Sequence, residues 1–255
     1  REVLERIQAS GQPQDLSGDC LLVALIFPEE LLGGASVSCF LVFFRNMRFL
    51  LLLDARAEAL AMLWPGPLTM IVPATDAVPR EVTGGRDTVA IRVPEHQLTL
   101  QVLSTLDGAV AAPSANRFGR VSPTTAQHVI DDIGDILDPD RDATLDGGPC
   151  LVGVESTIVD LTCDPPQILR PGGVPSPLLD RLLEPVDGSS IVAATGPARA
   201  SGMLPSHYAP ERGVVLVERE DRETLDPEAF VIDRADDPVE AARHLYDDLR
   251  RADTS

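Results

Sequence analysis

The stretch TVAIRVPEHQLTLQVLSTLDGAVAAP, residues 88–113, decides the fold class of this 255-residue chain. Residues 88–93 alternate along the chain with the period of two that predicts a strand with one apolar face. Residues 97–106 predict a helix, and 109–113 predict a second strand that ends at a proline. A strand, a helix and a strand in so short a stretch are typical of the α/β class.

The flanking segments continue this pattern. Residues 54–63 predict a helix that ends at WPGP (64–67), and 68–73 predict a strand. After residue 113, a helix is expected behind Ser122 as N-cap and Pro123 at the first helical position, with apolar residues at helical spacing as far as 137. Further strands are expected at 157–161 and 167–169, followed by a short helix near 177–183.

The two ends of the chain differ from this middle part. Within 1–53, the most apolar run, 37–53, shows no clear period, and three polar residues interrupt it well before the roughly 18 apolar residues that a membrane span needs. Residues 193–210 are rich in Ala, Gly, Pro and Ser and predict a linker. Short strands are then expected at 214–217 and 229–232 and a helix at 238–251, a fragment too small to be a comfortable domain alone.

We therefore predict a catalytic domain at 1–190 whose first 53 residues are atypical, a linker at 191–212, and a partial C-terminal domain at 213–255.

The composition argues against several classes of function. All 21 basic residues are arginine, against 40 acidic residues, for a formal charge of −19. This balance argues against bulk electrostatic binding to nucleic acid or anionic membrane, although a local arginine cluster could still serve. The four cysteines show no C-x-x-C pair and no zinc-ligand spacing, so we expect reduced thiols, a cytoplasmic location and no metal site.

Three segments carry polar groups suited to an anion. Along 88–92, Thr88 and Arg92 share the face opposite the apolar one, although an ordinary surface arginine is the alternative. The loop AAPSAN (111–116) is followed by Ser122, where a helix N-terminus would favour phosphate; an ordinary capped turn is the alternative. DGGP (146–149), GVEST (153–157) and Arg170 offer backbone donors, hydroxyls and a guanidinium.

Other chemistry has little support in the sequence. Residues 206–210, SHYAP, place two hydrogen-bonding aromatic side chains in the linker, which suits a lid or a plain spacer. No Ser-His-Asp or Cys-His set is placed convincingly. The aspartate-rich segment 131–146 is typical of a solvated face.

These motifs, in this order, resemble one family closely, the YrdC/Sua5 proteins. The matching segments are WPGPLT (64–69), TVAIRVP (88–94), APSAN (112–116) with RVSPTT (120–125), DGGP (146–149) with GVESTIVD (153–160), and RPG (170–172). HYAP (207–210) and the closing LYDDLR (245–250) resemble the longer, two-domain Sua5 type. The resemblance implies a twisted mixed sheet with flanking helices, then a linker and a partial, small Rossmann-like α/β domain.

The resemblance also implies an activity. Such proteins are L-threonylcarbamoyladenylate synthases, nucleotidyltransferases that condense L-threonine, bicarbonate and ATP, with Mg²⁺, into threonylcarbamoyl-AMP and pyrophosphate for threonylcarbamoyl modification of tRNA. The resemblance implies roles for matching positions: Thr88, Ser114, Asn116, Ser122, Arg170 and Tyr208 would bind ATP, and Arg92, Ala112 and Ser156 would bind threonine. No residue is assigned as a covalent catalyst or metal ligand. Partners would be tRNA threonylcarbamoyl-transfer proteins, with direct contact to tRNA or double-stranded RNA left open and no membrane expected.

One departure keeps other functions open. The family has a Lys-x-Arg-Pro segment in its amino-terminal half-site, and this sequence contains no lysine. FPEE (27–30) is at best a remnant of the family's Pro-Thr-Glu-Thr strand end. The alternatives are a family member with impaired catalysis and a double-stranded RNA-binding module.

Overall fold

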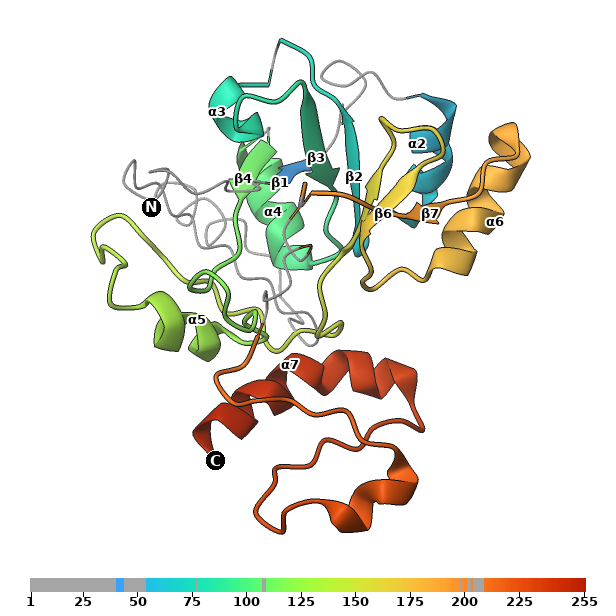
Figure 1. Ribbon diagram of the computed structural model, residues 1–255. Helices are drawn as coiled ribbons and strands as arrows, with labels where there is room; N and C mark the ends of the chain where they lie inside the picture. Colours follow the sequence, from blue (N-terminus) through green and yellow to red (C-terminus); the bar gives the residue numbers. More distant parts are fainter. Residues whose placement is uncertain are drawn as a thin grey trace.

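A mixed sheet runs through the centre of the molecule, with the strand order β4-β1-β3-β2-β5-β6-β7 (Figure 1). The computed structural model describes residues 40–43, 54–76, 78–106, 109–197, 199–200, 203 and 209–255. The strands are β1 Phe40–Phe43, β2 Leu68–Pro73, β3 Thr88–Arg92, β4 Ala109–Ala112, β5 Thr157–Asp160, β6 Gln167–Arg170 and β7 Val192–Ala193. This architecture confirms the expected α/β class with a mixed sheet.

The apolar run 37–53 contributes a strand to the sheet. β1 pairs in parallel with β3, Val42 opposite Arg92, and antiparallel with β4, Phe40 opposite Ala112. The rest of the atypical segment 1–53 lies outside the described residues. Within the part of the chain that the structure describes, no helix has the length and hydropathy needed to cross a membrane.

The strand directions decide which ends of the strands meet. β2 runs antiparallel to β3, with Met70 opposite Ile91, and parallel to β5, with Leu68 opposite Thr157. β6 returns antiparallel to β5, with Ile158 opposite Arg170. The C-terminal ends of β3 and β6 therefore lie at the same edge of the sheet as the N-terminal ends of β2 and β5.

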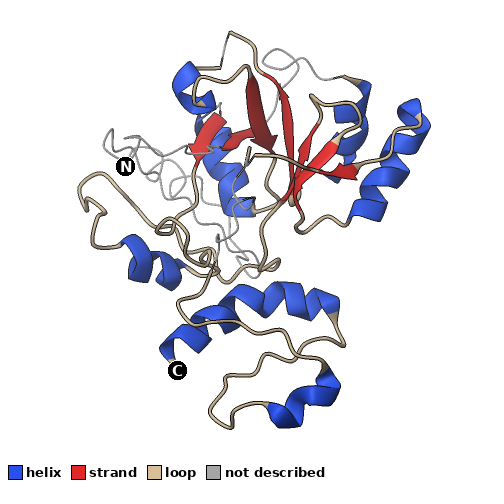
Figure 2. Ribbon diagram, in the orientation of Figure 1, coloured by secondary structure: helices blue, strands red, loops and turns tan. Residues whose placement is uncertain are grey.

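Helices cover the sheet and extend the chain beyond it (Figure 2). They are α2 Ala55–Leu60, which continues into the 3-10 turn η3 Ala61–Leu63, α3 Arg80–Thr83, α4 Gln97–Leu106, α5 Ala126–Ile133, α6 Ser176–Asp187, the 3-10 helix η4 Arg219–Thr224 and α7 Pro238–Thr254. Asp54 caps α2, its carboxylate accepting from the backbone N–H of Ala57 at 2.9 Å. This cap explains the sharp start of the helix.

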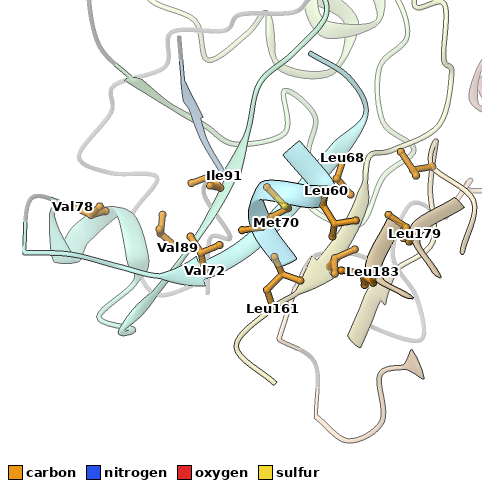
Figure 3. Packing of buried hydrophobic residues seen from close by; sticks show 13 residues of the cluster. Leu60, Leu68, Met70, Val72, Val78, Val89, Ile91, Leu161, Leu179 and Leu183 are labelled. Atoms are coloured by element: carbon orange, nitrogen blue, oxygen red, sulfur yellow. The ribbon is translucent and has the colours of Figure 1, made fainter. Parts of the chain in front are cut away.

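The main core joins α2 and α6 to the apolar sides of the central strands (Figure 3). Leu60 of α2 and Leu183 of α6 are fully buried, as are Met70 of β2 and Ile91 of β3. In β3, buried Val89 and Ile91 alternate with partly exposed neighbours, as the period of two predicts. The core therefore fixes which face of β3 is left for polar groups.

The predicted cap at Ser122 is wrong. Helix α5 begins at Ala126, and the N-cap is Thr125, whose hydroxyl accepts from the backbone N–H of His128 at 3.2 Å. Ser122 is buried, and its hydroxyl donates a hydrogen bond to the carboxylate of Glu155 in another loop. The helix also ends at Ile133, before the residues near 137 that the apolar spacing had included.

The predicted strands at 214–217 and 229–232 are also wrong. Among the described residues, neither segment pairs with another strand, and both run as loops on either side of η4 (Figure 2). Leu216 is 96% exposed. A strand needs a neighbour for its backbone hydrogen bonds, and β propensity alone does not supply one. The predicted helix at 238–251 is confirmed by α7; the proposed domain limits stay a prediction.

Two neighbouring residues test the core. Leu60 is 0% exposed and Met62 is 77% exposed. Leu60→Ala should lower the free energy of unfolding by about 2–5 kcal/mol, because it leaves a cavity between α2, α6 and the sheet. Met62→Ala is the control and should change it by less than about 0.5 kcal/mol. Urea denaturation followed by circular dichroism measures both; equal losses would contradict the placement of α2.

Candidate active site

Polar side chains gather at the edge where the ends of β3 and β6 meet the beginnings of β2 and β5. Arg92 ends β3, Arg170 ends β6, Thr69 is the second residue of β2, and Ser156 directly precedes β5. The sheet register alone brings these four positions together. We call this set, with Glu155 and Ser122 described below, the arginine cluster.

Arg170 is buried and donates two hydrogen bonds to Ser156. Its Nε donates to the carbonyl oxygen of Ser156 at 3.0 Å, and its Nη2 donates to Ser156 Oγ at 3.0 Å. Ser156 Oγ also lies 2.7 Å from Thr69 Oγ1. A buried guanidinium with several hydrogen bonds has a fixed orientation, so these contacts give the Ser156 hydroxyl a defined position.

Glu155 links this group to a second loop. One carboxylate oxygen accepts from the Ser122 hydroxyl, and the other lies 3.4 Å from Nη2 of Arg170. Ser122 and Arg170 are 48 positions apart in the sequence, and Glu155 is the residue that joins them. The carboxylate is partly exposed, so it is also accessible to a bound molecule.

Arg92 completes the positive charge of the cluster. Its Nε donates to the carbonyl oxygen of Gly66 at 3.0 Å, which anchors the guanidinium to the loop before β2. Burial lowers the pKa of Arg92, and the nearby Glu155 carboxylate opposes this effect while the Arg170 charge adds to it. The cluster holds two guanidinium groups and one carboxylate, so it carries surplus positive charge in a chain of net charge −19. Such a site suits an anion.

A glycine turn allows the close packing behind Arg170. The backbone N–H of Gly173 donates to the carbonyl oxygen of Glu155 at 3.0 Å. A Cβ atom at Gly172 would overlap that same oxygen and the backbone between Ser156 and Thr157. The turn after β6 therefore accepts only glycine at this position without a shift of the backbone that carries Glu155 and Ser156.

The loop after β4 is organised by Asn116. Its Nδ2 donates to the carbonyl oxygens of Arg117 at 3.1 Å and Arg120 at 3.0 Å. Its Oδ1 is buried and has no hydrogen-bond partner among the described residues. Asn116 thus holds its own loop, and its free acceptor is the polar group there that a ligand could satisfy.

The predicted site residues divide into three groups. The structure brings together Arg92, Ser122, Ser156 and Arg170. Thr88 lies at the other end of β3, opposite Pro73, which places it about 13 Å along the strand from Arg92. Ser114 is exposed after β4, and Ala112 ends that strand opposite Phe40. Tyr208 lies outside the described residues. Their roles in binding stay predictions.

Two members of the cluster were not predicted. Glu155 belongs to the GVEST segment, but a carboxylate beside an expected anion site gives no sequence signal of its own role. Thr69 lies within a strand in which four of six residues are buried, so its position resembles core. The adjacency of Glu155 to Ser156 was the one available signal for the first.

Comparison with known proteins gives matches over most of the chain. Residues 41–172 match the Sua5/YciO/YrdC family model, described as telomere recombination. Residues 178–255 match the model described as threonylcarbamoyl-AMP synthase, C-terminal domain. The threonylcarbamoyl-AMP synthase of Pyrococcus abyssi is 43% identical over 165 residues, 64% of this chain and 47% of that protein. That of Bacillus subtilis is 40% identical over 157 residues, 61% of this chain and 44% of that protein.

Solved structures of Sua5 proteins also match this chain. The crystal structure of P. abyssi Sua5 complexed with L-threonine matches with a TM-score of 0.73 and 31% identity, covering 99% of this chain and 76% of that one. A P. abyssi Sua5 variant with a consecutive His and Tyr both replaced by Ala matches with a TM-score of 0.70 and 30% identity, covering 99% and 74%. The matched region spans less than half the length of the two curated relatives above.

The charge balance of the arginine cluster yields a prediction. Glu155→Gln removes the carboxylate charge beside Arg170, so the variant should lose about 1–3 kcal/mol of unfolding free energy. Added pyrophosphate should raise its melting temperature more than that of the wild type, because the anion replaces the lost charge. Glu184→Gln, on α6, is the matched control. Equal pyrophosphate effects in all three proteins would contradict an anion site at Glu155.

Proposed function

Because the chain belongs to the Sua5/YciO/YrdC family, we propose that it is an L-threonylcarbamoyladenylate synthase. The reaction condenses L-threonine, bicarbonate and ATP to threonylcarbamoyl-AMP and pyrophosphate. The observation that carries the proposal is the arginine cluster. Arg170 is bonded to Ser156 and paired with Glu155, and the Arg92 charge lies close enough to interact with both Arg170 and Glu155. Two of the three substrates of this reaction carry carboxylate or phosphate groups that such a cluster would bind.

Each arginine is proposed to take one substrate. Arg92, with Ser156 and Ala112, would hold threonine, the guanidinium binding the amino-acid carboxylate. Arg170 and Ser122 would bind ATP phosphates, and Ser114, Asn116, Thr88 and Tyr208 are proposed to contribute to ATP binding. The free Oδ1 of Asn116 supports a role for the loop after β4, since a ligand N–H or O–H would satisfy it.

The proposed chemistry needs positioning more than covalent catalysis. The threonine amine forms a new N–C bond to bicarbonate carbon with loss of water, and a carbamate oxygen then attacks the α-phosphorus of ATP. The phosphorus–oxygen bond to the leaving group breaks, and pyrophosphate departs with its electron pair. Arg170 would offset charge on the phosphates, and Arg92 would keep the threonine amine at the reacting carbon.

Magnesium is proposed to enter with ATP as part of that substrate. Mg²⁺ in such sites is bound mostly by substrate phosphates and waters, with one or two carboxylates. In the described ranges, no group of three or more His, Cys, Asp or Glu side chains is placed to hold a metal ion. Glu155 is the carboxylate within the arginine cluster, and it fits the role of a single protein partner.

The product would then pass to tRNA threonylcarbamoyl-transfer proteins in a cytoplasmic setting. The RNA-binding alternative has less support from the structure. Arg117 pairs with both carboxylate oxygens of Asp135 at 2.7 Å, and Arg120 pairs with Glu211. These contacts occupy exposed arginines that a phosphate backbone would need.

A product assay tests the proposed reaction. The purified chain, supplied with ATP, magnesium, L-threonine and bicarbonate, should form threonylcarbamoyl-AMP detectable by mass spectrometry. Omission of any one substrate should abolish the product. Formation of product would also show that the family's lysine-bearing segment is dispensable or replaced by an arginine. A folded chain that forms no product would instead support the impaired family member, and steeply salt-dependent binding of double-stranded RNA would support the binding module.

The division of substrates between the arginines can be measured by calorimetry. Arg170→Ala should weaken ATP binding about 10- to 100-fold, the loss expected for charge-assisted hydrogen bonds, and weaken threonine binding less. Arg92→Ala should show the reverse order. Because Arg170 also holds Ser156, the Ser156→Ala variant serves as the control for that indirect part. Equal losses for both ligands in both arginine variants would refute the assignment.

A further inference from the structure

Helix α7 reaches the site through Arg250, a residue with no role in the proposed reaction. Its Nε donates to the carbonyl oxygen of Ser122 at 3.1 Å, and its Nη2 donates to that of Val121. The same guanidinium pairs with both carboxylate oxygens of Asp132 on α5, at 3.2 and 2.6 Å. The two side chains are only 15% and 16% exposed. One residue of the C-terminal segment thus fixes the backbone that carries Ser122.

The same helix also contacts the loop before β5. Arg243 Nε donates to the carbonyl oxygen of Leu151 at 3.2 Å. A Cβ atom at Gly153 would overlap the carbonyl oxygen of Arg243, so the backbone of α7 lies directly against this glycine. Gly153 stands two positions before Glu155. The position of the Glu155 loop therefore depends on the position of α7.

These contacts connect α7 to both loops of the arginine cluster. Helix α7 contacts the segment that carries Ser122 and the segment that carries Glu155, and the side chains of Ser122 and Glu155 hydrogen-bond each other. His128 of α5 adds a further contact, its Nε2 lying 3.8 Å from the Asp247 carboxylate of α7. Figure 1 shows α7 lying below the sheet and next to α5.

We propose that α7 braces the two loops of the arginine cluster, and that Arg250 is the positioning residue of this brace. Arg250 acts through the carbonyl groups of Val121 and Ser122 and has no contact with the reacting atoms. The C-terminal segment thereby tunes the affinity of the site for the ATP phosphates that are proposed to bind at Ser122. The predicted change in ATP affinity rests on the proposed function. The predicted change in the structure of the two loops does not.

The chain offers a matched control in the next residue. Arg251 is on the same helix and carries the same charge, but its side chain is 61% exposed and pairs with Asp248 of its own helix at 3.3 Å. Arg250→Gln and Arg251→Gln change net charge equally. Arg250→Lys keeps the charge but loses the planar fork that serves two carbonyl groups and a carboxylate together.

Calorimetry of the full chain with ATP and magnesium is the first measurement. Arg250→Gln should raise the dissociation constant for ATP about 2- to 30-fold, the range that coupled positions away from a ligand produce. Arg250→Lys should fall between it and the wild type, and Arg251→Gln should match the wild type. Asp132→Asn should weaken ATP binding too, and combining it with Arg250→Gln should cost less than the sum of the two changes.

Amide hydrogen exchange provides a readout that needs no ligand. In Arg250→Gln, the N–H of Cys150, bonded to Thr124, and that of Gly173, bonded to Glu155, should exchange faster. The N–H of Leu161, bonded to Ile71 in the sheet, should not. If Arg250→Gln does not fold, Arg250→Lys and Asp132→Asn carry the same comparison.

The outcomes separate the two proposals. A wild-type chain that binds no ATP would refute the proposed function, while faster exchange confined to the loop amides would still support the brace. ATP affinity and loop exchange that are the same in Arg250→Gln and the wild type would refute the brace. Faster loop exchange with unchanged ATP affinity would refute the positioning role of Arg250.

Discussion

The burial of Arg170 is the constraint on which the site depends. A guanidinium removed from water is strongly unfavourable unless hydrogen-bond acceptors surround it, and breaking a buried ion pair costs about 3–5 kcal/mol. Ser156 and Glu155 supply acceptors at the end of β6. They can do so because the glycine turn lets the chain after β6 lie against their backbone. The need to satisfy one charge therefore fixes the loop, the turn and the hydroxyls together.

The directions of the paired strands bring the other residues of the site together. Antiparallel pairing of β2 with β3 and of β5 with β6, with parallel pairing between β2 and β5, brings two strand ends and two strand beginnings to one edge. Each of those four positions carries a polar side chain that the adjacent apolar core does not exclude. A site built this way needs few long loops, because the ladder hydrogen bonds hold its parts in register.

Local chemistry in the sequence predicted most elements of the sheet domain, and it failed where a distant partner decides. Residues 68–73 and 97–106 have turn signals at their ends and a clear period, and both elements form as expected. Ser122 and Thr125 are both residue types that cap helices, and the contact of Ser122 with Glu155, 33 positions away, shows why Ser122 is not used. The runs 214–217 and 229–232 favour strands but have no pairing partner among the described residues. The arginine pair was predictable from its strand ends; Glu155 was not, because its role depends on a contact between two loops.

The contact at Gly153 bears on how this protein can change over evolution. The two parts of the chain match separate family models, which invites the view that they are interchangeable modules. At Gly153, however, the backbone of α7 lies so close that any side chain larger than that of glycine would overlap it. A recombinant protein with a different C-terminal segment would need a helix whose backbone passes Gly153 as α7 does, and it would need to keep this glycine. Substitutions on either side of this contact are therefore restricted by the residues on the other side. The two parts of the chain must evolve together at this contact.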